Sequence, residues 1–402
     1  MRILQFTSQA EIANIMHNIG VDPYGIKIML PKALSFGIRL NLISSVNANI
    51  IKQEMLSLGG DAAVARGCLA GKIEKTDVLL LGQLLQFRTL ADKLKVQPFG
   101  LNKLGMEIKE NIVNYNKNNF ILKLRQCSLN LSKRTHIMGV INLTPDSFSG
   151  DGLYKVGSKE HLNLALEKAK QMAKDGADII DLGGQSSRPG AKEITLKEEL
   201  LRTVPVVKLL AKKISTPISI DTNKPEVAKA AMEAGAQIIN DICGLSNKNM
   251  IKIAAKYKAA VVLMHMQGMP INMQNKASYS CLIDNICDIL KTRIESVVFG
   301  GIAADKIIID PGIGFGKTVV HNLEIIRYLA SFKILGKPIL LGVSKKSFIG
   351  EILKADINER SPGSLAACII AANNGANIVR VHNVKETQQA LKILNTINNR
   401  HA

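Results

Sequence analysis

The clearest structural signal in the chain is Met138-Gly-Val-Ile-Asn-Leu-Thr-Pro-Asp-Ser-Phe-Ser-Gly-Asp-Gly152. A short run of apolar and small residues ends in Asn142 and continues into a Thr-Pro-Asp-Ser-Phe loop. This order is typical of a buried parallel strand that brings a polar side chain and a loop to one end of a sheet. The same arrangement recurs from Thr135 onward, so we expect one end of the sheet to collect ligand-binding residues.

Eight short apolar strands alternate with helix-like stretches in this region, and several strands follow a Gly-Ala pair typical of a tight αβ turn. The predicted strands are 136–142, 178–182, 218–221, 237–241, 260–265, 307–310, 339–344 and 377–382. This count predicts an eight-stranded parallel (β/α)8 TIM barrel. An open doubly wound sheet is the rival, but it would gather ligand groups at one switch point rather than at nearly every strand end.

Residues 1–118 have a different texture and are predicted to form a smaller α/β N-terminal domain. Residues 119–402 are predicted to form the barrel domain, with an entry hairpin at Phe120–Leu131. The Asn- and Lys-rich segment Asn111–Asn119 is interpreted as the linker between the two domains.

The composition is that of an ordinary globular protein, with 402 residues, 47% hydrophobic and 21% charged. No apolar run approaches the roughly 18 residues of a membrane span, and the N-terminus lacks the pattern of a secretion signal. Six scattered cysteines without a CxxC pair predict reduced thiols in the cytoplasm. The net charge of +19 is spread along the chain, which favours attraction of an anionic substrate over nucleic-acid binding.

Polar side chains stand at the ends of several predicted strands. Asp221, Asn240 with Asp241, and Asp310 follow three of them. A single carboxylate there often caps the next helix, but three at one rim are harder to explain that way. Two carboxylates and an amide would complement the N–H donors and the carbonyl of an amino-pyrimidinone edge, which predicts a flat heterocyclic ligand.

The loop Gly183–Gly190 follows the second strand. Its glycines let the backbone approach a ligand, and Ser186, Ser187 and Arg188 offer hydroxyls and a cationic fork. The alternative is an ordinary polar loop of the barrel.

The sixth unit reads Asp310-Pro-Gly-Ile-Gly-Phe-Gly-Lys-Thr318. It is not a nucleotide-binding P-loop, because Pro311 stands where that motif needs its first glycine. We interpret it as a glycine-rich barrel loop that presents Phe315.

Cationic residues follow the last two strands. Lys346 and Ser347 come directly after the seventh strand and are expected at the barrel mouth, while Arg380 and His382 share one face of the eighth. This pair would give charge and a hydrogen bond to phosphate, where such barrels often bind it. His265 is interpreted as a structural histidine rather than a metal ligand, because no second ligand lies near it in sequence.

These blocks together resemble the dihydropteroate synthase family. They are NLTPDSFS, GGQSSRPG, SIDTNKPEVA, INDICG, LMHMQG, DPGIGFGK, GVSKKSFIG and RVHNV, in family order over residues 120–397. The resemblance implies a barrel that joins 6-hydroxymethyl-7,8-dihydropterin diphosphate to 4-aminobenzoate, giving 7,8-dihydropteroate and diphosphate. It also implies a homodimer.

The resemblance further implies roles for single residues. Asn142 would ligate the Mg²⁺ that holds the diphosphate. The residues that would bind the pterin are Asp221, Asn240, Asp310 and Lys346. Those that would bind the diphosphate are Ser187, Arg380 and His382. The aminobenzoate pocket would be shaped by Phe148, Pro189, Phe315 and Ser347, and Arg188 and Val381 would also bind substrate. The catalytic set would be Asn142, Lys346, Arg380 and His382.

The chain departs from the family pattern at four places. Gln185 and Ser187 stand where the family usually has Glu and Thr, Lys345 stands for Arg, and Asn383 stands for Asp. A lysine keeps the charge of arginine without its bidentate geometry. We expect these departures to affect the rate rather than the reaction.

Two alternatives share the pterin site. A pterin-dependent methyltransferase would have little need for the Pro-Asp-Ser-Phe loop, the Ser-Arg-Pro loop or the pair Arg380 and His382. A non-catalytic pterin-binding homologue would have little need for Asn142 and Lys346. The N-terminal domain resembles an extension of some longer family members, for which packing or oligomer formation is the leading interpretation.

Overall fold

The computed structural model describes residues 1–4, 6, 8–144, 158–185, 193–268 and 278–398. The chain divides into two compact units, Met1–Asn114 and Tyr115–Ala402. Each unit has its own hydrophobic core. No helix within the described residues is long and apolar enough to cross a membrane.

The first unit is an α/β domain built on a three-stranded antiparallel sheet of order β1-β3-β2. Strand β3 alternates exposed and buried positions, with Val78 and Leu80 turned into the core, as a sheet covered on one face requires. The elements of this unit are α1 Gln9–Ile19, α2 Pro23–Ala33, β1 Ser35–Ser44, α3 Ser45–Ser57, β2 Asp61–Val64, β3 Lys75–Gln83, α4 Leu84–Leu94 and α5 Leu101–Tyr115.

Helix α5 corrects the predicted linker. We expected Asn111–Asn119 to be irregular, but the helix continues to Tyr115. Ile108 and Ile112 are buried four residues apart on one face of this helix, so packing against the core overrides the polar composition of the segment.

The second unit begins with the hairpin of β4 Ile121–Lys123 and β5 Ser128–Asn130. Leu122 and Leu131 belong to one apolar cluster with Met138 and Ile378, which lie at or near the starts of their strands. The hairpin therefore helps to fill the amino-terminal end of the barrel.

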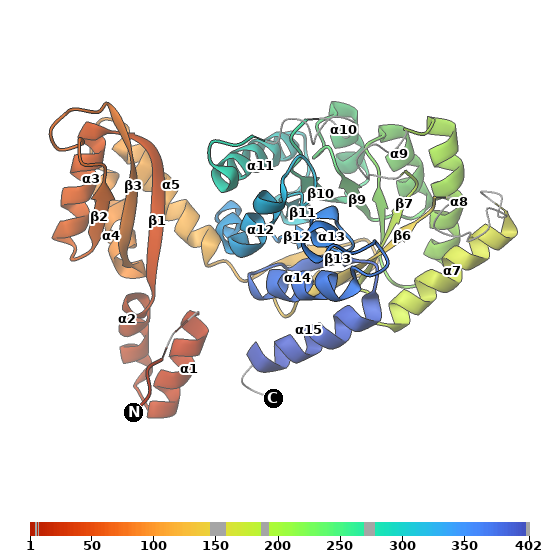
Figure 1. Cartoon of the computed structure of the whole chain (residues 1–402), viewed down its shortest axis with the longest axis horizontal. Coiled ribbons are helices and arrows are strands. Elements are labelled where there is room, and N and C mark those ends of the chain that lie inside the picture. The colour runs from red at the N-terminus through yellow and green to blue at the C-terminus, as the bar shows by residue number, and fades with distance from the viewer. Residues whose placement is uncertain (5, 7, 145–157, 186–192, 269–277, 399–402) are drawn as a thin grey trace. The chain divides into compact units, whose positions relative to one another are not determined.

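The eight-stranded parallel sheet confirms the predicted barrel (Figure 1). Its strand order is β11-β10-β9-β8-β7-β6-β13-β12, and a bridge between Ile309 and Ile339 links the first strand to the last. The strands are β6 His136–Asn142, β7 Ile179–Gly183, β8 Ile218–Asp221, β9 Ile238–Asp241, β10 Ala260–Met264, β11 Ile307–Asp310, β12 Leu340–Leu341 and β13 Ile378–Val381.

Helices surround these strands on the outside (Figure 1). A large apolar cluster fills the layer between helices and strands, as expected when both faces of a parallel sheet are covered. The helices are α7 Lys159–Lys174, α8 Leu196–Lys213, α9 Pro225–Ala234, α10 Lys248–Lys256, α11 Leu282–Phe299, α12 Val319–Arg327, α13 Ser347–Leu353, α14 Ser361–Asn373 and α15 Val384–Asn398, with short 3-10 turns at Ala304–Lys306 and Leu329–Leu335.

The glycines predicted at the αβ turns adopt backbone conformations that suit glycine. Gly176, Gly235 and Gly375 have φ of 102°, 121° and 107°. A Cβ on Gly235 would lie 2.5 Å from the Cβ of Ala211, so the turn needs both the open φ and the space.

Candidate active site at the barrel mouth

The carboxyl ends of the barrel strands form the mouth, and Arg380 on β13 joins several of them. Its Nε donates a hydrogen bond of 2.7 Å to Asp181 Oδ2, and its Nη2 donates one of 2.6 Å to Asp221 Oδ2. Asn240 Nδ2 donates to the same oxygen of Asp181 at 3.2 Å. One guanidinium thus holds two carboxylates together on β7 and β8, beside the amide of β9.

Asp181 is a member of this group that our sequence analysis missed. Its side chain is fully buried inside β7, and both Arg380 and Asn240 bind it. A carboxylate within an otherwise apolar strand is the signal that could have found it, because a buried charge requires a partner.

The electrostatics of the mouth follow from burial and shared charges. Burial raises the pKa of Asp221 to about 7, an effect that Arg380 opposes and the nearby Asp181 reinforces. Burial also lowers the pKa of Lys346 to about 8, with Arg380 adding to the effect, while Asp310 and Asp221 act against it. Burial raises the pKa of Asp310, and the Gly312 N–H and Lys346 oppose this. Charge interactions therefore couple four residues at one site, namely Asp221, Asp310, Lys346 and Arg380.

Arg380 itself stays charged. Burial opposes its charge, but Asp181 and Asp221 overcome that effect and raise its pKa. Strand β12 ends at Leu341, earlier than the predicted Ser344.

In the loop after β11, Phe315 is buried and lies against Lys346. The ammonium of Lys346 lies 4.2 Å from the centre of the Phe315 ring, a cation–π contact. Asp310 Oδ1 accepts a 2.7 Å hydrogen bond from the Gly312 N–H at the base of this loop. Gly312 has φ of 77°, and a Cβ there would meet the carbonyl oxygen of His265 at 1.9 Å, so only glycine fits.

Lys317 fixes the other end of the loop. Its ammonium is buried and lies 3.0 Å from the Phe315 carbonyl oxygen and 3.0 Å from His265 Nδ1. Burial lowers the pKa of Lys317 to about 7, and Asp310 counters part of that effect. Burial, then Lys317, lowers the pKa of His265 to about 3, so His265 is neutral.

His382 is also neutral. Burial, then the charge of Arg380, lowers its pKa to about 3. Ser344 Oγ accepts the His382 backbone N–H at 3.4 Å and lies 3.0 Å from the ring Nδ1. When the Ser344 hydroxyl donates a hydrogen bond to Nδ1, the neutral ring carries its own proton on Nε2. That N–H can then donate to a ligand.

A pocket of about 590 Å³ lies beside the loop after β11, which contains Phe315 and Lys317. Ser347, which we expected at the mouth, lines it together with Lys317, Thr318, Val319, Val320, Asn322, Phe348 and Glu351.

Asn142 stands at the end of β6, opposite Gly183 of β7 in the parallel ladder. A Cβ on Gly183 would lie 3.6 Å from Asn142 Oδ1 and 3.9 Å from Asp221 Oδ2. The missing side chain thus leaves space between an amide oxygen and a carboxylate. Within the described residues no group of three or more His, Cys, Asp or Glu is arranged to hold a metal.

Four residues of the expected site lie outside the described residues. They are Phe148, Ser187, Arg188 and Pro189.

Comparison with known proteins gives consistent matches. Residues 138–382 match the model of a family described as pterin binding enzyme. The dihydropteroate synthase of Synechocystis sp. is 43% identical over 278 residues, which are 69% of this chain and 94% of the relative. A probable bifunctional folylpolyglutamate synthase/dihydropteroate synthase of Halobacterium salinarum is 34% identical over 376 residues, which are 93% of this chain and 44% of that protein.

Among solved structures, the Yersinia pestis dihydropteroate synthase in complex with a sulfonamide drug is similar, with a TM-score of 0.65 and 42% identity. The match covers 69% of this chain and 99% of that structure. This structural match excludes the open doubly wound sheet as the fold of the second unit.

Proposed function

The chain belongs to the pterin binding enzyme family, among its dihydropteroate synthases, and we propose from its barrel mouth which residues carry the reaction. It is a transferase of folate biosynthesis that condenses 6-hydroxymethyl-7,8-dihydropterin diphosphate with 4-aminobenzoate. The observation that best supports the residue assignment is the shared guanidinium, through which Arg380 binds Asp181 and Asp221 beside Asn240.

The pterin is proposed to lie on the polar floor of the mouth. Asp221 and Asp310 would accept hydrogen bonds from the N–H groups of the ring, and the Asn240 amide can both donate and accept. Lys346, whose ammonium already lies over Phe315, would donate to a ring carbonyl or nitrogen. Because these groups are held by one another before a ligand arrives, little reorganisation is needed on binding.

The diphosphate is proposed to bind at the end of β13. Arg380 and Lys346 would neutralise the charge that develops as the diphosphate leaves. His382 would donate through Nε2, with Ser344 holding its ring from the opposite side. Val381 would add its backbone, and Ser187 its hydroxyl.

Magnesium is proposed to bind at Asn142. An amide oxygen is a ligand of the type that Mg²⁺ accepts, and the space above Gly183 leaves room for the water and phosphate oxygens that Mg²⁺ retains. A bound magnesium would supply positive charge that makes diphosphate a better leaving group.

The 4-aminobenzoate is proposed to bind in the pocket beside the Phe315 loop. Ser347 lines this pocket, Phe315 belongs to the adjoining loop, and Phe148, Arg188 and Pro189 complete the proposed set. The aromatic ring of Phe315 suits a flat substrate, and the Ser347 hydroxyl suits its carboxylate.

The reaction needs no covalent enzyme intermediate. The C–O bond between the pterin methylene and the diphosphate breaks, and the electron pair leaves with the diphosphate. The electron-rich pterin stabilises the positive charge on the methylene, the amine of 4-aminobenzoate attacks that carbon, and its proton is released. The enzyme therefore contributes mainly position and charge.

Purified protein should release diphosphate only when dihydropterin diphosphate, 4-aminobenzoate and Mg²⁺ are all present. A pterin-dependent methyltransferase or a non-catalytic homologue would show no such release. Replacement of Asn142, Asp221 or Arg380 by alanine should lower kcat/KM by at least about a hundredfold, the range for lost transition-state contacts. Full activity in all three variants would refute the site assignment.

A homodimer is proposed through α14. This helix is apolar nearly all round, and Ile370 on its outer side is 51% exposed. Such a surface is typical of a protein interface. Light scattering should show a dimer for the wild type and a monomer for Ile370→Arg, and a monomeric wild type would rule the dimer out.

The six cysteines are free, which is the state expected in a reducing compartment. We propose that the enzyme acts in the cytoplasm.

A further inference from the structure

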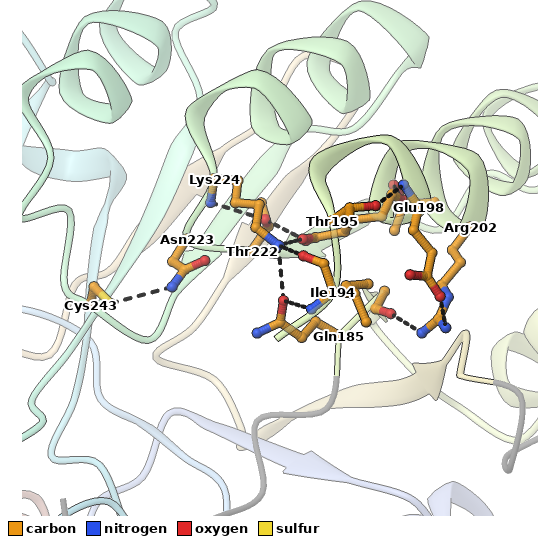
Figure 2. Close-up of polar contacts among 12 residues, drawn as sticks. Gln185, Ile194, Thr195, Glu198, Arg202, Thr222, Asn223, Lys224 and Cys243 are labelled. Atoms are coloured by element: carbon orange, nitrogen blue, oxygen red, sulfur yellow. Dashed lines mark hydrogen bonds and ion pairs between the residues drawn. The ribbon is translucent and has the colours of Figure 1, made fainter. Parts of the chain in front are cut away.

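Lys224 lies three residues after Asp221, between β8 and α9, and its ammonium has three oxygen partners (Figure 2). It donates to Gln185 Oε1 at 2.9 Å, to the Ile194 carbonyl at 2.8 Å and to Glu199 Oε2 at 2.8 Å. An ammonium has three protons, so each one has an acceptor. We call Lys224 and these three partners the Lys224 clamp.

Glu199 connects the clamp to the barrel floor. Its carboxylate is buried, and its second oxygen accepts a 2.6 Å hydrogen bond from Thr222 Oγ1. Thr222 directly follows Asp221, and its backbone N–H donates to the Asn240 carbonyl at 3.0 Å. The clamp is therefore two hydrogen bonds away from the proposed pterin floor.

The clamp also joins the two ends of one connection. Gln185 precedes residues 186–192 and Ile194 follows them closely, and the Ile194 N–H donates to the same Gln185 oxygen at 3.4 Å. Arg202 of α8 adds a hydrogen bond of 2.9 Å to the neighbouring Gly184 carbonyl (Figure 2). The connection that contains Ser187, Arg188 and Pro189 thus starts and ends at fixed positions relative to Asp221.

Stability alone is a weak reason for this arrangement. The Lys224 and Glu199 side chains are 16% and 2% exposed, and removing such charges from water offsets most of their attraction. An apolar pair of similar size would stabilise the fold about as well. What only a lysine or arginine supplies here is several directed hydrogen bonds to partners on three segments.

We propose that Lys224 is a positioning residue for the transfer reaction, which sets the ends of the connection between β7 and α8 against the pterin floor. This inference rests on the proposed function. The amide of Gln185 contributes an acceptor without a second negative charge, so Glu199 is the single carboxylate in the clamp. Because Arg188 and Pro189, which are proposed for aminobenzoate, belong to this connection, loss of the clamp should disturb the placement of aminobenzoate more than the binding of the pterin ring.

The test is the double variant Lys224→Met with Glu199→Gln, which cuts the clamp without leaving a buried charge unpaired. We expect the KM for 4-aminobenzoate to rise at least about tenfold, since small misplacements near a reacting centre have effects of this size. The Kd of 6-hydroxymethylpterin, which lacks the diphosphate, should stay within about twofold, because Arg380 still holds Asp221. Lys224→Arg should recover part of the KM, since a guanidinium also donates several hydrogen bonds.

The matched control is Lys170→Met with Glu167→Gln. It makes the same change in an exposed ion pair of 2.9 Å on α7 and should leave KM, Kd and melting temperature near those of the wild type.

Two results would overturn the inference. One is an unchanged KM for 4-aminobenzoate in the cut clamp. The other is a parallel loss of pterin binding and melting temperature, which would make the clamp part of the fold only. Wild-type turnover is measured first, so that its absence would count against the proposed function and not against the clamp.

Discussion

At the scale of single residues, the protonation of the pterin floor depends on how one guanidinium is shared. Arg380 binds both Asp181 and Asp221, so the positive charge of one guanidinium is shared between two carboxylates. This is why burial and the neighbouring Asp181 can keep the pKa of Asp221 near 7 despite an ion pair of 2.6 Å.

Asp181→Asn should therefore shift the acid limb of kcat/KM for dihydropterin diphosphate to lower pH. Asp221 is proposed to act as a carboxylate, so activity falls as pH drops through its pKa. The asparagine keeps an oxygen for Arg380 Nε but removes the negative charge that raises the pKa of Asp221. A pH–rate profile measures the limb.

The control is Asp178→Asn, the same change at the start of the β7 segment, where Asp178 pairs with Arg134. It should not move the acid limb. An unshifted or higher limb in Asp181→Asn would mean that Asp221 does not govern it.

Lys317 gives a second prediction at this scale. Because burial lowers the pKa of Lys317 to about 7 in the folded protein, against 10.5 for an ordinary lysine, the unfolded chain binds more protons between these pH values. The contribution of Lys317 to stability therefore rises with pH over this window, by up to about 1.4 kcal/mol per pH unit. Relative to Lys317→Met, the wild type should gain stability between pH 7.5 and 9.5.

Urea unfolding of both proteins at these two pH values measures the difference. Lys256→Met, at the end of α10, serves as the control and should show a constant difference. A constant difference for Lys317→Met as well would mean that its ammonium keeps an ordinary pKa in the folded protein.

The residue scale also shows what sequence could and could not reveal. Asp221, Asp310, Lys346 and Arg380 were predictable because each stands at or beside a strand end, where the barrel fold fixes its direction. The Lys224 clamp was not, because Glu199 lies in the first turn of α8 and meets Lys224 only after that helix has packed.

At the scale of elements, helices α4 and α5 cross closely at Gly105. A Cβ there would lie 2.7 Å from the Ala91 carbonyl oxygen and 3.0 Å from the Leu94 Cβ. Gly105→Ala should force the two helices apart and destabilise the first unit by about 1–3 kcal/mol. The barrel has a separate core, so its turnover should not change.

Differential scanning calorimetry together with the diphosphate assay tests this prediction. Gly100→Ala, at a glycine with open space around it but φ of 80°, separates backbone strain from crowding. A Gly105→Ala protein as stable as the wild type would show that the crossing can relax.

Strands were easier to predict than helix limits. The eight barrel strands stand out because continuous apolar runs between glycine turns leave few other assignments. Helix α10 is harder to recognise in the sequence, because its nine residues give only a short periodic signal, with Met250, Ile251 and Ala254 buried on one face. The end of α5 was misjudged because its polar residues resemble a linker and only the tertiary core shows why Ile112 is helical.

At the scale of the whole molecule, the two units have separate cores and unequal relations to known enzymes. The Yersinia pestis structure is matched over 99% of its length by 69% of this chain, so that enzyme has the barrel without a counterpart of the first unit. The Halobacterium salinarum relative matches 93% of this chain, which includes much of the first unit.

A shortened protein that begins at Tyr115 should therefore fold and turn over. All the proposed site residues lie within Tyr115–Ala402, and the hairpin of β4 and β5 stays with the barrel that it fills. We expect kcat and both KM values within about threefold of the full chain, since independent sites contribute additively. Steady-state kinetics of the two proteins make the comparison, and a protein beginning at Ser132, which lacks the hairpin, is the matched control that should lose stability. A folded but inactive Tyr115 protein would show that the first unit takes part in catalysis, and would place its role in the reaction rather than in packing or assembly.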